Sequence, residues 1–229
     1  MFIVKLLTYT EQSWMKVNNI IYITGPDGSG KTTFIKEIED NLHGKGLKTK
    51  HLWLRSPKLL SKPLMAYCRL VGLTKYEVID GIRYGRHEFY RSKLVSRIFP
   101  VLQVIDFAIK WFLIKRKLFK NQFLLVDRFS LDTLSDLMVD TGRMDLPNNY
   151  IGKILINFIP DLSNVLVLQT NEQTIKNRKK DTLHDPHLKL KIQSYEHLIN
   201  ELKLSIINNN DNYKNVKEKV FNFFKIETY

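Results

Sequence analysis

A short glycine-rich run near the start of the chain has the residue types and spacing that bind a polyphosphate. The run is Gly25-Pro26-Asp27-Gly28-Ser29-Gly30-Lys31-Thr32-Thr33, which fits the P-loop pattern G-x-x-x-x-G-K-[ST]. Its glycines allow the backbone to turn N–H groups inward around a phosphate chain. In such a loop Lys31 would reach the β- and γ-phosphates, and the Thr32 hydroxyl would hold Mg²⁺. The predicted ATP-binding residues are Gly25, Asp27, Gly28, Ser29, Gly30, Lys31, Thr32 and Thr33.

The segments on either side of this loop have the patterns that a phosphate-binding loop needs. Residues 19–24 are apolar and β-rich and predict a buried strand, while residues 33–42 carry apolar side chains at helical spacing. The alternative is a glycine turn followed by a chance lysine. The order of strand, loop and helix favours the phosphate site.

A carboxylate at the end of another apolar run could hold the metal ion. Residues 123–127 (FLLVD) predict a buried strand that ends in Asp127, an arrangement in which the aspartate helps to bind Mg²⁺. We therefore expect Thr32 and Asp127 to form the metal site. Arg128 follows at a position where many ATP-driven motor proteins carry a water-activating glutamate. This difference favours transfer to a bound acceptor over hydrolysis.

Strands and helices alternate along the rest of the chain. This alternation predicts an α/β protein with a three-layer P-loop NTPase fold, a parallel sheet flanked by helices and a ligand at the carboxyl ends of the strands. Residues 19–229 would form this P-loop domain, with residues 1–18 as an N-terminal extension. Residues 58–120 are expected to be mostly helical. Further strands are expected over 48–54, 164–168 and 204–208, and further helices over 171–180, 187–203 and 212–224.

Composition limits the classes of partner. The 229 residues are 44% hydrophobic and 26% charged, as in an ordinary globular domain, and the net charge of +13 favours anionic partners. The positive charge is spread along the chain, so we expect nucleotide substrates and no stable nucleic-acid complex. Because Cys68 is the single cysteine, an intramolecular disulfide is excluded. We predict that Cys68 is a small, buried apolar side chain.

The most apolar segment, residues 98–114, is interrupted by polar residues and is too short for a full membrane span. We expect no membrane span and, because residues 1–7 lack the basic leader of a signal peptide, a cytoplasmic location. A helix packed in the core is the preferred interpretation of 98–114, and a peripheral amphipathic helix is the alternative. Its apolar stripe is expected to consist of Ile98, Leu102, Ile105, Ile109 and Phe112.

With these motifs placed, the chain resembles the thymidylate kinase family of nucleoside monophosphate kinases over about residues 19–225. It looks closer to a divergent branch in which the Asp-Arg-aromatic motif runs on to an aspartate such as Asp132. The matching segments are residues 25–33, Arg55-Ser56-Pro57, Asp127-Arg128-Phe129 and Asn177-Arg178-Lys179-Lys180.

This resemblance implies ATP- and Mg²⁺-dependent phosphoryl transfer to a nucleoside monophosphate, with conversion of dTMP to dTDP as the first expectation. It places Asp27 near the sugar of the acceptor, and Arg55 and Arg128 near its phosphate. Arg178 would close over the transferred group from a short lid at about residues 178–187. The catalytic residues would thus be Lys31, Asp127, Arg128 and Arg178. The family tendency also implies a homodimer through helices, for which the helix at 98–114 could serve.

Some positions differ from the family pattern. The family usually has a thymine-reading arginine on the helix that precedes the Asp-Arg pair, and this chain has Asp106-Phe107 there, so Phe107 is assigned to the acceptor site. The Tyr-Gln pair of the family has no match in residues 134–139, and Ser56 replaces a glutamate. Further candidates for acceptor binding are Arg83, Arg86 and Arg91.

Three alternatives to a dTMP kinase therefore stay open. The chain could be a thymidylate-kinase-like kinase of another small acceptor, or a nucleic-acid-linked P-loop NTPase. It could also be a binding module that keeps ATP but has lost catalysis.

Overall fold

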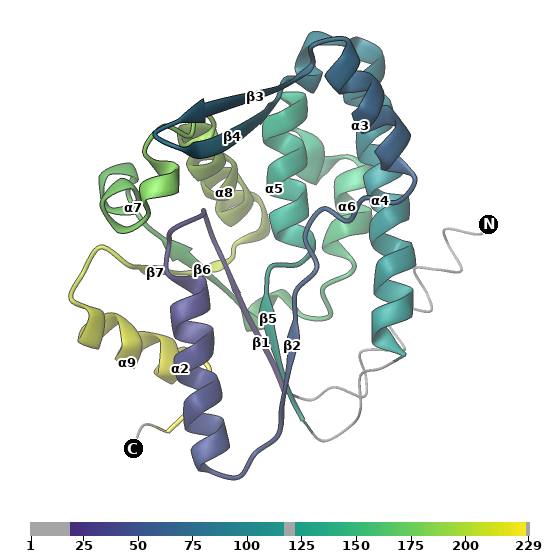
Figure 1. The fold of residues 1–229 in the computed structure, drawn as a ribbon. Helices are drawn as coiled ribbons and strands as arrows, with labels where there is room; N and C mark the ends of the chain where they lie inside the picture. Colours follow the sequence, from purple (N-terminus) through teal and green to yellow (C-terminus); the bar gives the residue numbers. More distant parts are fainter. Residues whose placement is uncertain (1–18, 117–121, 228–229) are drawn as a thin grey trace.

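A five-stranded parallel sheet forms the centre of the protein (Figure 1). The computed structural model describes residues 19–116 and 122–227, so the N-terminal extension predicted over residues 1–18 lies outside it. The strand order is β2-β5-β1-β6-β7, and every neighbouring pair is parallel. The strands are β1 (Ile20–Thr24), β2 (Thr49–Leu52), β5 (Phe123–Asp127), β6 (Val165–Gln169) and β7 (Ser205–Asn208). The predicted parallel α/β sheet is thus confirmed.

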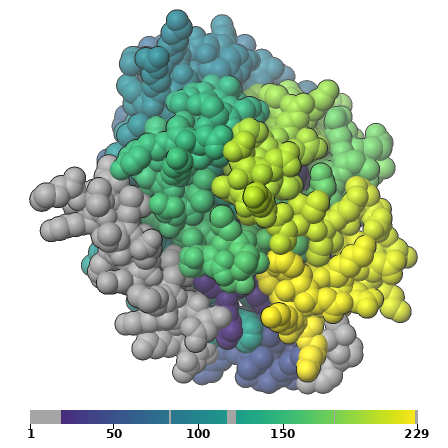
Figure 2. Space-filling view, turned by 180° about the vertical axis from the view of Figure 1, so that it is seen from behind, coloured from purple at the N-terminus to yellow at the C-terminus, as the bar shows by residue number. Residues whose placement is uncertain are grey.

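Helices cover both faces of this sheet because side chains alternate between the faces of each strand. Ile21 and Ile23 of β1 pack with Phe34 in one apolar cluster, and Tyr22 packs with Phe129 in the other. Helices α2 (Lys31–Gly44) and α9 (Tyr213–Phe223) contribute to the first cluster. The second is covered by α3 (Ser61–Leu70), α4 (Lys93–Lys115), α5 (Ser130–Thr141), α6 (Tyr150–Ile156) and α8 (Leu188–Leu202). Seen from behind, the green segment of α5 and α6 meets the yellow-green α8 (Figure 2).

A β-hairpin interrupts the region that was predicted to be mostly helical. Strands β3 (Thr74–Ile79) and β4 (Ile82–His87) pair antiparallel, so the helical prediction is wrong over these residues. Asp80 and Gly81 connect them with φ of +51° and +75°, as a tight two-residue hairpin turn requires. The hairpin crosses the top of the molecule in Figure 1, and Asp80 pairs with His184 at 3.3 Å.

Helix α4 presents one side to the core and the other to solvent. The buried side includes Phe99, Gln103, Phe107 and Trp111. The predicted core stripe lies on the opposite side: Ile98 and Ile109 are exposed, and Leu102, Ile105 and Phe112 are partly exposed. The helix does pack in the core, but the stripe assigned to that contact was wrong. Within residues 19–116 and 122–227, no helix is long and apolar enough to cross a membrane.

A buried carboxylate on α4 holds the start of α3. Asp106 accepts hydrogen bonds from the backbone N–H groups of Leu59, Leu60 and Ser61 at 2.7–3.0 Å, and from Ser61 Oγ at 2.6 Å. These N–H groups lie at a helix N-terminus, where a negative charge is favourable. Asp106, which stands near the expected thymine-reading position, therefore joins two helices.

We expect Asp106→Asn to lower the free energy of unfolding by about 2–4 kcal/mol, because its NH₂ group would face donors and leave buried N–H groups unpaired. Urea denaturation measures this change. The exposed Asp40 on α2 gives a matched control, since Asp40→Asn should change the stability by less than about 0.5 kcal/mol. Equal effects of the two substitutions would contradict the role assigned to Asp106.

Candidate functional site

The glycine loop, residues 25–30, connects β1 to α2 with a backbone that only glycine adopts easily. Gly25, Gly28 and Gly30 have φ of +141°, +84° and +96°. A Cβ added to Gly25 would lie 2.6 Å from the carbonyl oxygen of Leu168 on β6. The conformation of the loop and its close contact with the sheet both depend on these glycines.

Lys31, the first residue of α2, is held across the loop. Its Nζ donates to the carbonyl oxygens of Gly25 at 2.7 Å and Pro26 at 2.8 Å, and the side chain is buried. Burial lowers the pKa of Lys31 to about 8, and the positive charge of Arg128 acts in the same direction. An anion bound in the loop would therefore stabilise the ammonium form.

Thr32, in the first turn of α2, meets Asp127 at the carboxyl end of β5. Strand β1 pairs with β5 so that Ile23 lies opposite Asp127, and Thr32 Oγ1 donates to Asp127 Oδ2 at 2.7 Å. Asp127 Oδ1 is buried and has no hydrogen-bond partner among the described residues. A hydroxyl beside an unpartnered carboxylate oxygen fits Mg²⁺, which commonly takes one or two protein ligands and fills its shell with phosphates and water. In the described ranges, His, Cys, Asp and Glu form no metal-binding group of three or more.

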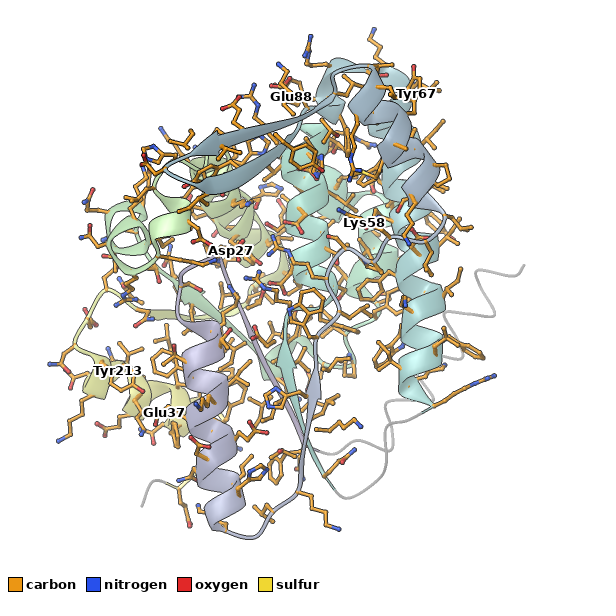
Figure 3. All side chains as sticks on the ribbon, in the orientation of Figure 1. Asp27, Glu37, Lys58, Tyr67, Glu88 and Tyr213 are labelled. Carbon is orange, nitrogen blue, oxygen red and sulfur yellow. The ribbon has the colours of Figure 1, made fainter. Side chains whose placement is uncertain are left out.

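Two arginines from adjacent strand ends converge on Asp27. Arg128 donates through Nη2 to Asp27 Oδ1, and Arg55 Nη1 lies 3.2 Å from Asp27 Oδ2. Arg55 also makes a two-pronged contact with Asp136 on α5, at 2.5 and 2.7 Å. Burial alone would raise the pKa of Asp27, but the two guanidinium groups outweigh it and hold that pKa well below its usual range. Figure 3 labels Asp27 at the tip of the glycine loop.

The backbone of Arg128 is strained. Its φ is +81°, a left-handed conformation that costs a non-glycine residue roughly 1–2 kcal/mol. Leu54 N donates to the Arg128 carbonyl oxygen at 3.0 Å, which ties this turn to the residues after β2. The guanidinium also lies 3.6 Å from Asp132 Oδ1. These contacts fix the direction of the Arg128 side chain toward the glycine loop.

Asp132 has a larger role than sequence reasoning suggested. It is fully buried and accepts hydrogen bonds from Tyr22 Oη at 3.0 Å, Tyr195 Oη at 2.9 Å and the Phe129 backbone N–H at 3.0 Å. It thereby joins β1, α8 and the turn that carries Arg128. Only the aspartate itself was visible in the motif, because its partners come from distant parts of the chain.

Two more residues of the site were missed. Asn209, just after β7, donates through Nδ2 to the Ser29 carbonyl oxygen at 2.7 Å and so supports the glycine loop. Lys191 on α8 contacts Asp185 at 3.1 Å. Burial alone would lower the pKa of Lys191, but Asp185, Asp136 and Asp27 raise it above the ordinary value. No local pattern marks either residue.

The structure does not bring every predicted residue to this site. The ring of Phe107 is fully buried and packs on Phe129 and Phe158, at centroid distances of 5.1 and 5.0 Å. A ring without exposed surface has nothing to offer an acceptor, so its assignment was wrong. Arg86 and Arg91 instead pair with Glu88, at 2.6 and 3.0 Å, near the top of Figure 3 and apart from Asp27. The side chain of Arg83 lies outside the described part of the structure.

The start of the segment predicted as a lid, residues 178–187, lies beside the loop, because a Cβ added to Gly28 would lie 3.5 Å from Lys179 Cβ. Helix α7 (Glu172–Arg178), which precedes it, places Ile175 Cγ2 3.0 Å from the same point. Arg178 ends this helix and is exposed, as is Thr33 in the first turn of α2. Cys68 is a buried free thiol, as predicted, and burial raises its pKa.

No protein-family model matches the chain, and no curated protein matches it. Its function is therefore inferred from its own residues and their geometry.

We expect Gly25→Ala to lower the free energy of unfolding by at least about 2 kcal/mol, because a Cβ would disfavour the required φ and clash with a backbone oxygen. Gly44, at the end of α2, has open space around an added Cβ. The control Gly44→Ala should be neutral or stabilising by up to about 1 kcal/mol. Urea denaturation of both variants tests this difference, and similar destabilisation would contradict the special role of Gly25.

Proposed function

We propose that the chain is a P-loop kinase of small molecules. More specifically, we propose ATP- and Mg²⁺-dependent phosphoryl transfer to a nucleoside monophosphate, with dTMP as the first acceptor to test, in the cytoplasm. The observation that carries this proposal is the 2.7 Å hydrogen bond between Thr32 and Asp127. The glycine loop predicted Thr32, and the apolar run at residues 123–127 predicted Asp127, as ligands of the same metal ion. In the fold the two side chains are in contact.

On the donor side, the glycine loop and the start of α2 direct backbone N–H groups toward a polyphosphate. Lys31 would leave the loop carbonyls that it now contacts and bind the β- and γ-phosphates. Thr32 and Asp127 would hold Mg²⁺, which neutralises phosphate charge when it is bound. Each group acts by position and charge, the two contributions that phosphoryl transfer requires from a protein.

On the acceptor side, Arg55 and Arg128 would bind the phosphate of the acceptor. A phosphate oxygen of a nucleoside monophosphate is already ionised near neutral pH, so it can attack the γ-phosphorus of ATP without a general base. The bond from that phosphorus to the β–γ bridging oxygen then breaks, and ADP leaves. Water would need a base, but the strongly lowered pKa of Asp27 makes this carboxylate a poor one. These electrostatics favour transfer over hydrolysis.

Arg178 would complete the site from the end of α7. Arg178 is exposed, and its neighbour Lys179 lies near Gly28, so the arginine would be able to approach the transferred group. A cation there would stabilise charge on the equatorial oxygens of the transition state, and closure of this segment would exclude water.

A coupled assay of ADP release tests the proposal. With ATP and Mg²⁺, we expect at least one nucleoside monophosphate to stimulate turnover in a panel that contains dTMP, dUMP, the other monophosphates, thymidine and single-stranded DNA. Lys31→Ala should reduce this turnover by at least about 100-fold, because a preorganised charge at the phosphates is lost. The exposed Lys36 on the same helix supplies the matched control, Lys36→Ala, which should retain activity.

Two outcomes of this assay would overturn the proposal. Stimulation by DNA alone would identify a nucleic-acid-linked NTPase. ATP binding without turnover for any acceptor would identify a binding module.

The lowered pKa of Lys31 predicts that ATP binding takes up a proton. Below about pH 7 the ammonium group is charged with or without ATP, but above about pH 8 the free protein loses this proton and ATP restores it. The affinity for ATP should therefore fall as the pH rises through this range. Calorimetry in buffers of different ionisation enthalpy measures the uptake. Lys31→Arg is the control, because arginine stays charged and should bind ATP without proton uptake.

A further inference from the structure

Three aspartates lie one helical turn apart on the side of α5 that faces the candidate site. Residues four apart on a helix share a side, so Asp132, Asp136 and Asp140 form a row that rises roughly 12 Å over eight residues. The first two are engaged: Asp132 by two tyrosine hydroxyls, and Asp136 by Arg55 and by Ser56 Oγ at 2.9 Å. Asp140 forms no hydrogen bond or ion pair within residues 19–116 and 122–227.

The carboxyl group of Asp140 is partly buried among charges that do not neutralise it. Burial raises its pKa well above the usual value, and the Asp136 carboxylate acts in the same direction. The positive charges of Lys191 and Lys58 offset these effects only in part. A carboxyl group without a partner costs stability, and such a cost is typical of positions where a ligand supplies the missing partner.

Lys58 places a hydrogen-bond donor near this carboxyl group. It lies in the loop between β2 and α3, three residues after Arg55 (Figure 3). Its charge acts on the pKa of Asp140, yet among the described residues the two side chains form no ion pair. One acceptor and one donor thus lie near each other with their hydrogen-bonding capacity unused.

The residues around the β-hairpin enclose this end of α5. Burial lowers the pKa of His87, at the end of β4, to about 4, and the positive charge of Lys58 acts in the same direction. The segment after β4 packs on the end of α5, where a Cβ added to Gly142 would lie 3.1 Å from Tyr90 Cβ. A ligand group beside Asp140 would therefore be shielded from water in part, which strengthens its hydrogen bonds.

We propose that Asp140 and Lys58 recognise the base of the acceptor through an edge that carries a ring N–H beside a carbonyl group. This inference rests on the proposed function, in which Arg55 and Arg128 hold the phosphate of the acceptor. The nucleoside then extends along the row on α5, Asp140 accepts a hydrogen bond from the ring N–H, and Lys58 donates to the carbonyl oxygen.

The bases that fit this pair of residues are thymine, uracil and guanine. In the same orientation, adenine and cytosine would turn an amino group toward the Lys58 ammonium and an unprotonated ring nitrogen toward the Asp140 oxygen. Both contacts would then be mismatched, which a site built from hydrogen-bonding groups rejects strongly.

Kinetics with methylated acceptors test this proposal. With ATP and Mg²⁺, dTMP is compared with N3-methyl-dTMP, and dGMP with N1-methyl-dGMP. For the better acceptor of the wild type, methylation should lower kcat/KM at least about 10-fold, because the N–H donor is lost. In Asp140→Ala, which removes the hydrogen-bond partner and makes room for the methyl group, the penalty should fall below about 3-fold. Asp140→Asn keeps a carbonyl acceptor and should keep the discrimination.

Matched controls separate recognition from stability. The exposed Asp40 on α2 gives Asp40→Ala, which should keep the full methylation penalty. Asp140→Ala should leave the urea midpoint of unfolding unchanged or raise it, because it removes an unpaired carboxyl group. A lowered midpoint would assign Asp140 a structural role and overturn the proposal.

Thermal shifts with the same nucleotides separate this inference from the proposed function. If no acceptor is phosphorylated, but dTMP or dGMP raises the Tm of the wild type and not that of Asp140→Ala, the proposed function fails and the base recognition stands. Turnover with equal methylation penalties in the wild type and Asp140→Ala gives the reverse result. A preference for AMP or CMP, or neither turnover nor thermal shift with dTMP and dGMP, would overturn the recognition by Asp140 and Lys58.

Discussion

The arrangement of the candidate site depends on one buried carboxylate, that of Asp132. A fully buried charge is costly unless hydrogen bonds compensate it, and here a central strand, a distant helix and a turn supply the donors. Tyr22 of β1 and Tyr195 of α8 both donate hydrogen bonds to the Asp132 carboxylate. The Phe129 N–H donates to it as well and so fixes the start of α5. Arg128 lies in the turn that Asp132 joins to these elements. The contacts of Asp132 therefore set the direction of the Arg128 side chain. The glycine loop begins directly after the strand that carries Tyr22.

Positive charge is concentrated where the carboxyl ends of the strands meet. Lys31, Arg55, Arg128 and Lys191 come from four elements, and each is partly or fully desolvated. Asp27 keeps two of the guanidinium groups paired. An anionic ligand can replace such internal pairs without a large rearrangement of charge. Under the proposed function, this balance would let the site stay stable without a ligand and still attract a highly charged substrate.

The local parts of the site were predictable, and the long-range parts were not. The strand, glycine loop and helix around Lys31 are encoded by adjacent residues, and Asp127 ends a recognisable apolar strand. Asn209 contacts the glycine loop from the far edge of the sheet. Its role therefore depends on the strand order, which local sequence patterns do not predict. The hairpin was missed even though Asp80-Gly81 between β-rich runs is a strong turn signal. In α4, two apolar stripes share one helix, and periodicity alone could not assign either stripe to the core.

Because φ of Arg128 is positive, the backbone and the side-chain contacts at this position favour different residue types. Glycine would suit the backbone better at this position but would remove the guanidinium that pairs with Asp27. The arginine is thus maintained by its electrostatic partners at the expense of local conformational preference. Loss of those partners would leave the turn free to relax, so the shape of the β5–α5 connection is coupled to the charge state of the glycine loop.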